Sequence, residues 1–470
     1  MKIAICASEA VPFAKTGGLA DVCGALPLEL EELGHEAIIV MPKYQSVRPS
    51  GALIKRLDED FDVTTIGEKT RVYFLKHDMY LRAGLYGGDF GDYPDNLKRF
   101  SYFCSKVLEL FSKIDLKPDI VHCNDWQTSL IPMFIKIYRD RYFPNVSKIP
   151  KSLLTIHNVS YQGLFPREAM PETGLGWEHF NLLGLEFYDK LNLLKGGIQY
   201  ADIVNTVSVT HAREIQTKEF GCGMEGVLAD KKGRFFGVLN GIDYKVWNPQ
   251  GDPNIFKNYS SDNIEAKTVN KLKLQALCGF VQGGKVPLFG FVGRLVEQKG
   301  IDLILEVLPK LLAHGAQTIF LGKGEPKYEA ALFEIVKAHP GSCFFSSNFD
   351  DILAHRIYAA SDIFLMPSAF EPCGIGQMIS CKYGTVPIVY KTGGLADTII
   401  DHDLKSNKGN GFVFTSYKAP EFELACMRAL ELFSDEKRMK DLRKRIMRLN
   451  FSWKESAKRY VGIYEEAMRI

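Results

Sequence analysis

The stretch that decides the fold is residues 2–42, KIAICASEAVPFAKTGGLADVCGALPLELEELGHEAIIVMP. Its apolar start, residues 2–8, predicts a short strand, and residues 21–34 carry apolar side chains at helical spacing as far as Gly34. Residues 37–42 predict a second strand. A strand, a helix and a strand within about forty residues form a βαβ unit of a parallel sheet. The sequence therefore predicts an α/β protein.

Three later segments repeat the pattern of a strand that runs into polar residues. They are DIVHCND (119–125), SLLTIHN (152–158) and DIVNTVS (202–208). In parallel sheets, ligands bind at the carboxyl ends of the strands. The polar residues at these ends are therefore candidates for a binding site.

The composition changes at residues 248–263, NPQGDPNIFKNYSSDN, which are rich in Pro, Gly, Asn and Ser and have no clear period. This stretch predicts a linker or an irregular connection, with a domain boundary near 245–265. New strands and a helix follow it and predict a second sheet, while the last residues predict an amphipathic helix. The predicted domains are 1–250, 251–450 and the helical segment 451–470; the second-sheet elements are 286–294, 301–315, 317–322, 360–368 and 385–390.

The bulk composition is that of an ordinary globular protein, with 470 residues, 46% hydrophobic and 24% charged. A net charge of +2 gives no overall attraction to nucleic acid or to anionic membranes, so any anion site must be local. The ten cysteines are scattered without a CxxC pair, which favours buried free thiols over a structural zinc site. The first apolar run is too short for a signal peptide or a membrane span. We expect a cytoplasmic protein, or a plastid one if a transit peptide has been removed.

One seven-residue string, KTGGLAD, occurs twice, at 15–21 and at 391–397. Paired glycines at the start of a helix let backbone N–H groups approach an anion, and the lysine adds a positive charge. A tight turn with a solvated lysine is the alternative for either copy. The repetition favours a function over a plain turn, but identical sequence does not require an identical role.

Two further loops carry charged residues that could bind a ligand. Arg294 and Lys299 lie five residues apart in GRLVEQKG (293–300), and two cations suit a diphosphate. Glu371, in AFEPCG (369–374), could accept hydrogen bonds from sugar hydroxyls. Solvated surface charges for the first loop, and an acid that complements a helix dipole for Glu371, remain open alternatives.

Several polar residues at strand ends have a structural alternative as well. His157 and Asn158 close a predicted strand and lead into Tyr161 and Gln162, Asp125 follows another strand, and Asn240 begins an NG turn. The acids form no HExxH, GxSxG or P-loop pattern. This absence argues against a metalloprotease, a serine hydrolase or a P-loop NTPase.

Seven strings are spread over most of the chain: KTGGLADV (15–22), DYPDN (92–96), TIHNVSYQG (155–163), NGID (240–243), GRLVEQKG (293–300), FEPCG (370–374) and KYGTVPIVYKTGGLADT (382–398). In these strings the chain closely resembles the bacterial glycogen synthase and plant starch synthase family. The resemblance implies a GT-B fold, two Rossmann-like domains whose parallel sheets face each other across a deep cleft, with the helix from about 451 crossing back to the first domain. It implies transfer of glucose from ADP-glucose to the non-reducing end of an α-1,4-glucan, with retention of configuration and without a metal or cofactor.

The resemblance also implies roles for individual residues. Arg294 and Lys299 match the pair that neutralises the diphosphate, Glu371 matches the residue that holds the donor glucose, and His157 matches the residue at the reacting carbon. The resemblance implies front-face attack, in which a phosphate oxygen of the leaving group takes the acceptor's proton. Lys15, near the donor phosphates and glucose, is the fifth catalytic residue that the resemblance implies. The implied substrate-binding positions are Gly17, Gly18 and Asp21 in the first copy, Asp125, Asn158, Tyr161, Gln162 and Asn240 in the first domain, and Phe349, Cys373, Gly374, Thr392, Gly393 and Gly394 in the second.

Three positions depart from the family pattern. Ala369 stands where the family usually has Arg, Gly376 where it has a hydroxyl or amide residue, and Phe349 where a Tyr often stacks on the base. These changes leave open a related enzyme that uses UDP-glucose, or a weakly active glucan-binding or priming homologue. The two KTGGLAD copies are expected to face each other across the cleft, and Cys373 is expected at a helix N-terminus, where a thiol can be reactive.

Overall fold

The computed structural model describes residues 1–48, 53–88, 91–144 and 148–470. By its internal contacts the chain divides into two units, Met1–Asn240 with Trp453–Ile470, and Gly241–Ser452. Residues 241–250, which the composition placed in the first domain, belong to the second unit, and the C-terminal helix belongs to the first.

The first unit is built on a mostly parallel sheet with the strand order β14-β13-β9-β8-β1-β2-β5-β4-β3 within the described residues. The strands from β14 to β5 are parallel, and β4 and β3 add antiparallel pairs at one edge. The central strands are almost wholly buried, as expected for a sheet covered on both faces. Their bounds are β1 Lys2–Cys6, β2 Glu36–Pro42, β3 Lys55–Arg56, β4 Phe61–Ile66, β5 Thr70–Leu75, β8 Ile120–Asn124, β9 Lys151–Ile156, β13 Ile203–Thr206 and β14 Phe235–Gly237.

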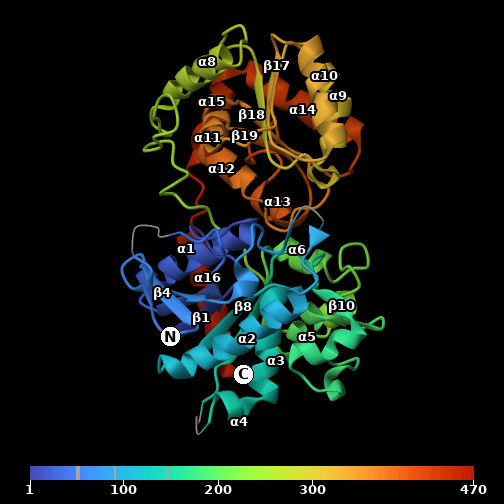
Figure 1. Cartoon of the computed structure of the whole chain (residues 1–470). Helices are drawn as coiled ribbons and strands as arrows, with labels where there is room; N and C mark the ends of the chain where they lie inside the picture. Colours follow the sequence, from blue (N-terminus) through green and yellow to red (C-terminus); the bar gives the residue numbers. More distant parts are fainter. Residues whose placement is uncertain (49–52, 89–90, 145–147) are drawn as a thin grey trace. The chain divides into compact units, whose positions relative to one another are not determined.

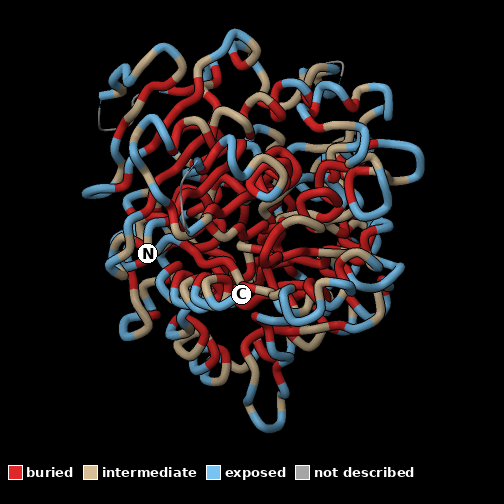
Figure 2. The backbone as a smooth tube through the Cα atoms, turned by 90° about the horizontal axis from the view of Figure 1, so that it is seen from below, coloured by how far each residue is buried: buried red, intermediate tan, exposed pale blue. Residues whose placement is uncertain are grey.

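Helices cover this sheet, and Figure 1 shows the red C-terminal helix α16 among the blue elements of the first unit. Helix α16 packs against α1 and β9, and its Tyr464 hydroxyl lies 2.8 Å from Nδ1 of His122 on β8. The buried backbone runs through the interior strands, whereas exposed segments lie in the outer loops (Figure 2). The helices are α1 Gly18–Glu32, α2 Asn96–Lys113, α3 Leu130–Ile137, α4 Arg139–Tyr142, α5 Leu193–Tyr200, α6 Val209–Glu214, α7 Glu225–Ala229 and α16 Trp453–Arg469.

Two small sheets lie outside the main one. The first pairs β6 (Gly87–Gly88) with β7 (Gly91–Asp92). The second has the order β10-β12-β11, and its strands follow β9 in the chain. Its strands are β10 Leu164–Pro166, β11 Glu186–Phe187 and β12 Lys190–Asn192.

The second unit has a fully parallel sheet in the described residues, with the order β17-β16-β15-β18-β19-β20. Its strands are β15 Leu288–Val292, β16 Gln317–Leu321, β17 Cys343–Ser346, β18 Ile363–Met366, β19 Val386–Tyr390 and β20 Phe412–Phe414. The helices are α8 Lys267–Leu277, α9 Ile301–Ala313, α10 Pro326–Ala338, α11 Asp351–Ala360, α12 Gly376–Lys382, α13 Gly393–Thr398, α14 Ala419–Ser434 and α15 Glu436–Met447.

Of the two alternatives predicted for residues 248–263, a linker or an irregular connection, the structure shows the irregular connection. The Asp252 carboxylate is buried, and Oδ2 lies 2.7 Å from Nδ1 of His355 and 2.6 Å from the Tyr383 hydroxyl. Trp247 stacks on His355 with ring centroids 4.0 Å apart. Composition alone does not reveal these long-range contacts, which fasten the stretch to the second unit.

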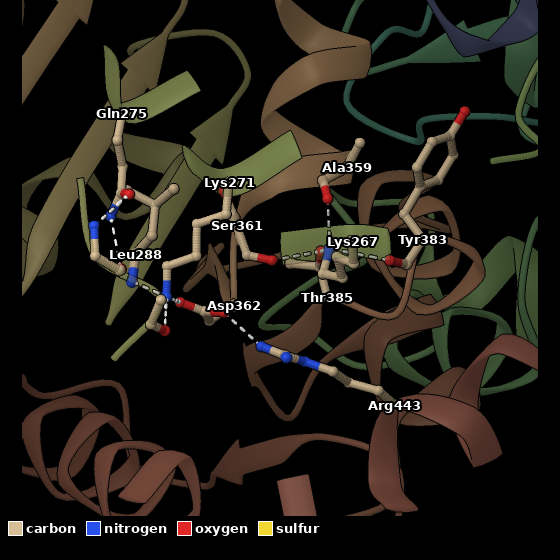
Figure 3. Close-up of polar contacts among 12 residues, drawn as sticks. Lys267, Lys271, Gln275, Leu288, Ala359, Ser361, Asp362, Tyr383, Thr385 and Arg443 are labelled. Atoms are coloured by element: carbon tan, nitrogen blue, oxygen red, sulfur yellow. Dashed lines mark hydrogen bonds and ion pairs between the residues drawn. The ribbon is translucent and has the colours of Figure 1, made fainter. Parts of the chain in front are cut away.

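A buried cluster of charged residues joins α8 to the amino ends of the second sheet's strands (Figure 3). The Lys267 ammonium donates to the carbonyls of Ala359 (2.8 Å) and Tyr383 (3.0 Å), at the C-terminal ends of α11 and α12, and to the Thr385 hydroxyl (2.8 Å). Burial lowers the pKa of Lys267 well below its usual range. Its hydrogen bonds satisfy carbonyl groups at the C-terminal ends of α11 and α12, as a C-terminal cap does.

Candidate functional site

In the first unit, the carboxyl ends of three neighbouring strands are tied together by polar side chains. Oδ1 of Asp125 accepts a hydrogen bond from the backbone N–H of His157 (2.7 Å), and Nε2 of His157 lies 2.9 Å from Oδ1 of Asn124. The Asn124 amide nitrogen in turn donates to the carbonyl of Cys6, at the end of β1 (3.1 Å). Asp125 has φ of 55°, a conformation that non-glycine residues rarely adopt. Such a conformation persists only where its surroundings hold it, and at functional sites it is frequent.

Burial sets the protonation of this cluster. It raises the pKa of the Asp125 carboxyl to about 7, although backbone N–H groups of His157 and Asn158 oppose the shift. Burial also lowers the pKa of His157 to about 3. The imidazole is therefore neutral at physiological pH, and because Asn124 offers an amide oxygen, Nε2 carries the proton. A neutral imidazole of this kind cannot serve as the acid of a reaction at neutral pH.

The first KTGGLAD copy is open. Lys15 is exposed, and its ammonium lies 2.7 Å from Oδ1 of Asp21. At Gly17 and at Gly18, an added Cβ would meet no described atom within 4 Å. Helix α1 begins at Gly18, and Gly17 provides no side-chain cap. The first N–H groups of this fifteen-residue helix are thus accessible to an anion.

Glu9 lies beneath this copy and was missed from the sequence. It is 3% exposed, and its carboxylate accepts the backbone N–H of Thr16 (2.5 Å) and the Thr16 hydroxyl (2.9 Å to Oε2). The signal was present as a single acid in the apolar stretch ICASEAVPF (5–13), directly after a strand. An acid in such a stretch is buried only when it has partners.

In the second unit, Lys299 forms an ion pair with Glu371, which is 8% exposed. The Ser368 hydroxyl also donates to Oε2 of Glu371 (3.1 Å). Gly300 makes this approach possible, because it has φ of 73° and an added Cβ would lie 2.2 Å from the carbonyl oxygen of Pro367. The loops after β15 and β18 are therefore packed backbone to backbone, with the ion pair beside the contact.

The second KTGGLAD copy packs against the FEPCG loop. The backbone N–H of Gly394 donates to the carbonyl of Glu371 (3.0 Å). An added Cβ would lie 2.0 Å from the Glu371 oxygen at Gly393, and 2.0 Å from the Cys373 oxygen at Gly394. These glycines are needed for close packing, so the second copy supports the loop that carries Glu371.

Gln377 also supports this loop and was not identified from the sequence. It is fully buried in α12, and its amide nitrogen donates to the carbonyls of Cys373 (3.1 Å) and Gly374 (3.0 Å). The expectation that Cys373 begins a helix is wrong, because α12 starts only at Gly376 and the Cys373 thiol is buried. An added Cβ at Gly376 would lie 3.2 Å from Phe364 and from the Tyr358 hydroxyl. A larger residue at 376 would therefore press on aromatic side chains.

The structure does not join every predicted residue to these two clusters. Arg294 is exposed, as are Phe349 (62%) and Tyr161 (59%). Gln162 is buried and bonded internally: its amide nitrogen donates to the carbonyl of Cys222 (2.9 Å), and its oxygen accepts from Asn192 (2.7 Å). Asn240 and Thr392 are buried. Gln162 therefore serves the local fold, and Asn240 is the last residue of the first unit before the chain enters the second.

Metal-binding clusters and membrane-spanning helices are both absent from the described residues. Over the described ranges, no group of three or more His, Cys, Asp or Glu residues is placed to hold a metal ion. Over the same ranges, no helix is both long enough and apolar enough to cross a membrane.

Known families match both units. The family model described as starch synthase catalytic domain matches residues 2–230, and the model described as glycosyl transferases group 1 matches residues 281–446. The glycogen synthase of Thermosipho melanesiensis is 44% identical over 485 residues, covering 100% of this chain and 99% of that protein. The chain belongs to the glycogen and starch synthase family. The glycogen synthase of Geotalea daltonii is a further relative. It is 45% identical over 99% of this chain and 98% of its own length.

Solved structures confirm the predicted fold class of this glycogen synthase family member. The catalytic domain of starch synthase IV from Arabidopsis thaliana covers 100% of the chain with a TM-score of 0.89 and 32% identity, and the match covers 99% of that domain. Sucrose-phosphate synthase from Thermosynechococcus elongatus, 16% identical with a TM-score of 0.62, shares the fold. The protein is a GT-B glucosyltransferase of glucan synthesis, and its family implies a glucan acceptor and a nucleotide-sugar donor.

Proposed function

We propose that this enzyme transfers glucose from ADP-glucose to the non-reducing end of an α-1,4-glucan, with retention of configuration. One observation carries the choice of donor: the starch synthase IV domain, which matches the whole chain, was solved bound to ADP and acarbose. The same reaction would account for the charges in the second unit. We place the reaction in the cytoplasm, because the relatives are bacterial and the ten cysteines are free thiols, as in a reducing compartment.

Lys299 and Glu371 would bind the two halves of the donor. A diphosphate carries about two negative charges, and Lys299 with the exposed Arg294 supplies two positive ones. As the bond from C1 to the diphosphate breaks, charge builds on the phosphate, and preorganised cations favour that change. Glu371, held by Ser368 and Lys299, would accept hydrogen bonds from hydroxyls of the glucosyl group.

The first unit would act on the glucosyl side. Lys15 and the open start of α1 offer a cation and free N–H groups, while the neutral His157 offers oxygen and nitrogen acceptors but no acidic proton. The carbonyl of His157 would stabilise positive charge that develops on the sugar. Asp125 would hold the His157 backbone in place through the bond of 2.7 Å.

We propose front-face attack for the chemical step. The bond from C1 to the phosphate oxygen breaks, the acceptor hydroxyl bonds to C1 from the same face, and a phosphate oxygen of the leaving group takes its proton. This route uses no enzymatic nucleophile, unlike the paired carboxylates of retaining glycosidases. A glucosyl adduct on a side chain, found by mass spectrometry of the enzyme trapped with donor, would contradict it.

The deciding experiment measures glucose incorporation into glycogen with labelled ADP-glucose and UDP-glucose, each with and without EDTA. We expect kcat/KM for ADP-glucose to exceed that for UDP-glucose by at least about tenfold, in line with discrimination by base contacts, and to be unchanged by EDTA. A preference for UDP-glucose would overturn the donor assignment and would implicate Ala369 and Phe349. Incorporation with neither donor would point to a glucan-binding homologue.

A further inference from the structure

The buried carboxylate of Glu9 takes no part in the steps of the proposed reaction. It follows β1 by three residues and is 3% exposed. Both donors of Thr16 reach it: the backbone N–H at 2.5 Å from Oε2, and the hydroxyl at 2.9 Å from Oε2 and 3.1 Å from Oε1. Thr16 stands between Lys15 and Gly17, so Glu9 bonds to the second residue of the first KTGGLAD copy.

The other contacts of this loop lie to either side of Thr16. The backbone N–H of Val11 donates to the carbonyl of Ala20 (3.0 Å), and Ala14 donates to Ala10 (3.1 Å). Gly17 and Gly18 have open space on the side of a Cβ. Packing therefore does little to fix residues 17 and 18. Lys15 is held by its ion pair with Asp21 (2.7 Å), and Thr16 by its hydrogen bonds to the Glu9 carboxylate.

We infer that Glu9 is a positioning residue for glucosyl transfer: by holding Thr16 it sets the direction of Lys15 and of the first N–H groups of α1. This inference rests on the proposed function. A carboxylate suits the task because it accepts two bonds at once and bonds to charged groups are the stronger ones. Misplacement of a substrate-binding group by about 1 Å can cost on the order of 100-fold in rate.

The charges around Glu9 make this arrangement sensitive to pH. Burial raises the pKa of Glu9 to about 7, the Thr16 bonds oppose the shift, Asp21 adds to it and Lys15 reduces it. Cys23 on α1, Tyr44, Tyr86 and Asp125 also face this carboxylate. Below about pH 7 the carboxyl takes up a proton, loses one acceptor and loosens its hold on Thr16. Activity is therefore expected to fall as the pH falls through this value.

The test is a double-mutant cycle with Glu9→Ala, Thr16→Val and the double variant, assayed on glycogen with ADP-glucose. Glu9→Ala should lower kcat by about 10- to 100-fold while the thermal midpoint stays close to wild type. Thr16→Val, which keeps the backbone N–H, should lose less. If Glu9 acts through Thr16, the double variant loses no more than Glu9→Ala alone, whereas independent effects would multiply.

Two further variants separate charge from fold. Glu9→Gln keeps one acceptor and cannot titrate, so it should retain more activity than Glu9→Ala. Its kcat should also fall less at low pH, because only the contribution of Asp125 to that fall remains. Glu32→Gln, which changes an exposed acid at the C-terminal end of α1, should match wild type throughout. Multiplicative losses in the cycle, or Glu9→Ala within twofold of wild-type kcat, would overturn the inference.

The proposed function can be wrong while the role of Glu9 is right, and further assays distinguish the two cases. If wild type uses UDP-glucose instead, the same cycle is run with that donor. If wild type uses neither donor, the proposed function is wrong, and Glu9 is judged by calorimetric binding of ADP at pH 8. Equal affinity in wild type and Glu9→Ala would then overturn the positioning role, whereas an affinity about tenfold weaker in Glu9→Ala would support it.

Discussion

The two copies of KTGGLAD have the same seven residues and different surroundings. At 15–21 the glycines have open space and a buried carboxylate holds the threonine; at 391–397 the glycines press against the carbonyls of Glu371 and Cys373. The second copy directly follows β19, whereas the first follows β1 only after a loop that contains Glu9. The glycines thus border open space in one copy and allow close backbone packing in the other, a difference that the sequence alone cannot express.

The largest expected effect is on the ion pair beside the second copy. Lys299→Ala should lower kcat by about 10²–10³-fold, because a cation that stabilises developing charge is lost, and circular dichroism should show the fold intact. Lys310→Ala is the control, since Lys310 is a surface lysine on α9 paired with Glu423. Near-normal turnover in Lys299→Ala would remove Lys299 from the mechanism.

Gly394→Ala should come next and would test the packing role directly. Its Cβ would lie 2.0 Å from the Cys373 carbonyl oxygen, so the FEPCG loop must move. We expect the free energy of unfolding to fall by about 1–3 kcal/mol and kcat/KM to fall by about 100-fold. The matched control is Gly18→Ala in the first copy, which should unfold like wild type. Equal destabilisation by both changes would abolish the contrast between the copies.

The two lysines of the copies should differ in importance. Lys15→Ala should lower kcat/KM by about 10- to 100-fold, since Lys15 stands beside the open helix start, where an anion can be bound. Lys391→Ala should stay within about threefold, since the second copy is used for packing. Steady-state kinetics of both variants under the same conditions test this prediction. A larger loss of kcat/KM in Lys391→Ala than in Lys15→Ala would contradict the assignment of the anion to the first copy.

The smallest expected effect is the change of kcat with pH, which we assign to two carboxyl groups of the first unit. Glu9 and Asp125 of the first unit have pKa values raised to about 7, so only about one-tenth of each is ionised at pH 6. We expect kcat to be about fivefold lower at pH 6 than at pH 8, and this fall to be smaller in Glu9→Gln. A flat kcat profile over this range would show that neither carboxylate controls turnover.

Much of the fold could be predicted because apolar runs mark the strands and polar residues mark their ends. Asp125, His157 and Glu371 all stood out in this way, and the structure places each at the carboxyl edge of its sheet. The roles of Gly393 and Gly394 could not be predicted, because they depend on a backbone contact with residues about twenty positions away. Glu9 and Gln377 escaped although their backbone partners lie only three to seven residues away, because the local fold decides which backbone groups they reach. The sequence left open whether 248–263 is a linker or an irregular connection, because Asp252 finds its partners more than a hundred residues later.

Helix α16 has a consequence for how the protein is made. It belongs to the first unit, where it packs on α1 and β9, yet it follows the whole of the second unit in the chain. On the ribosome the first unit must therefore wait, with the surface around His122 uncovered, until the second unit has been translated. A nascent chain that stops before Trp453 would hold a finished second unit and an unfinished first one, which makes the first unit the part of this enzyme most dependent on complete synthesis.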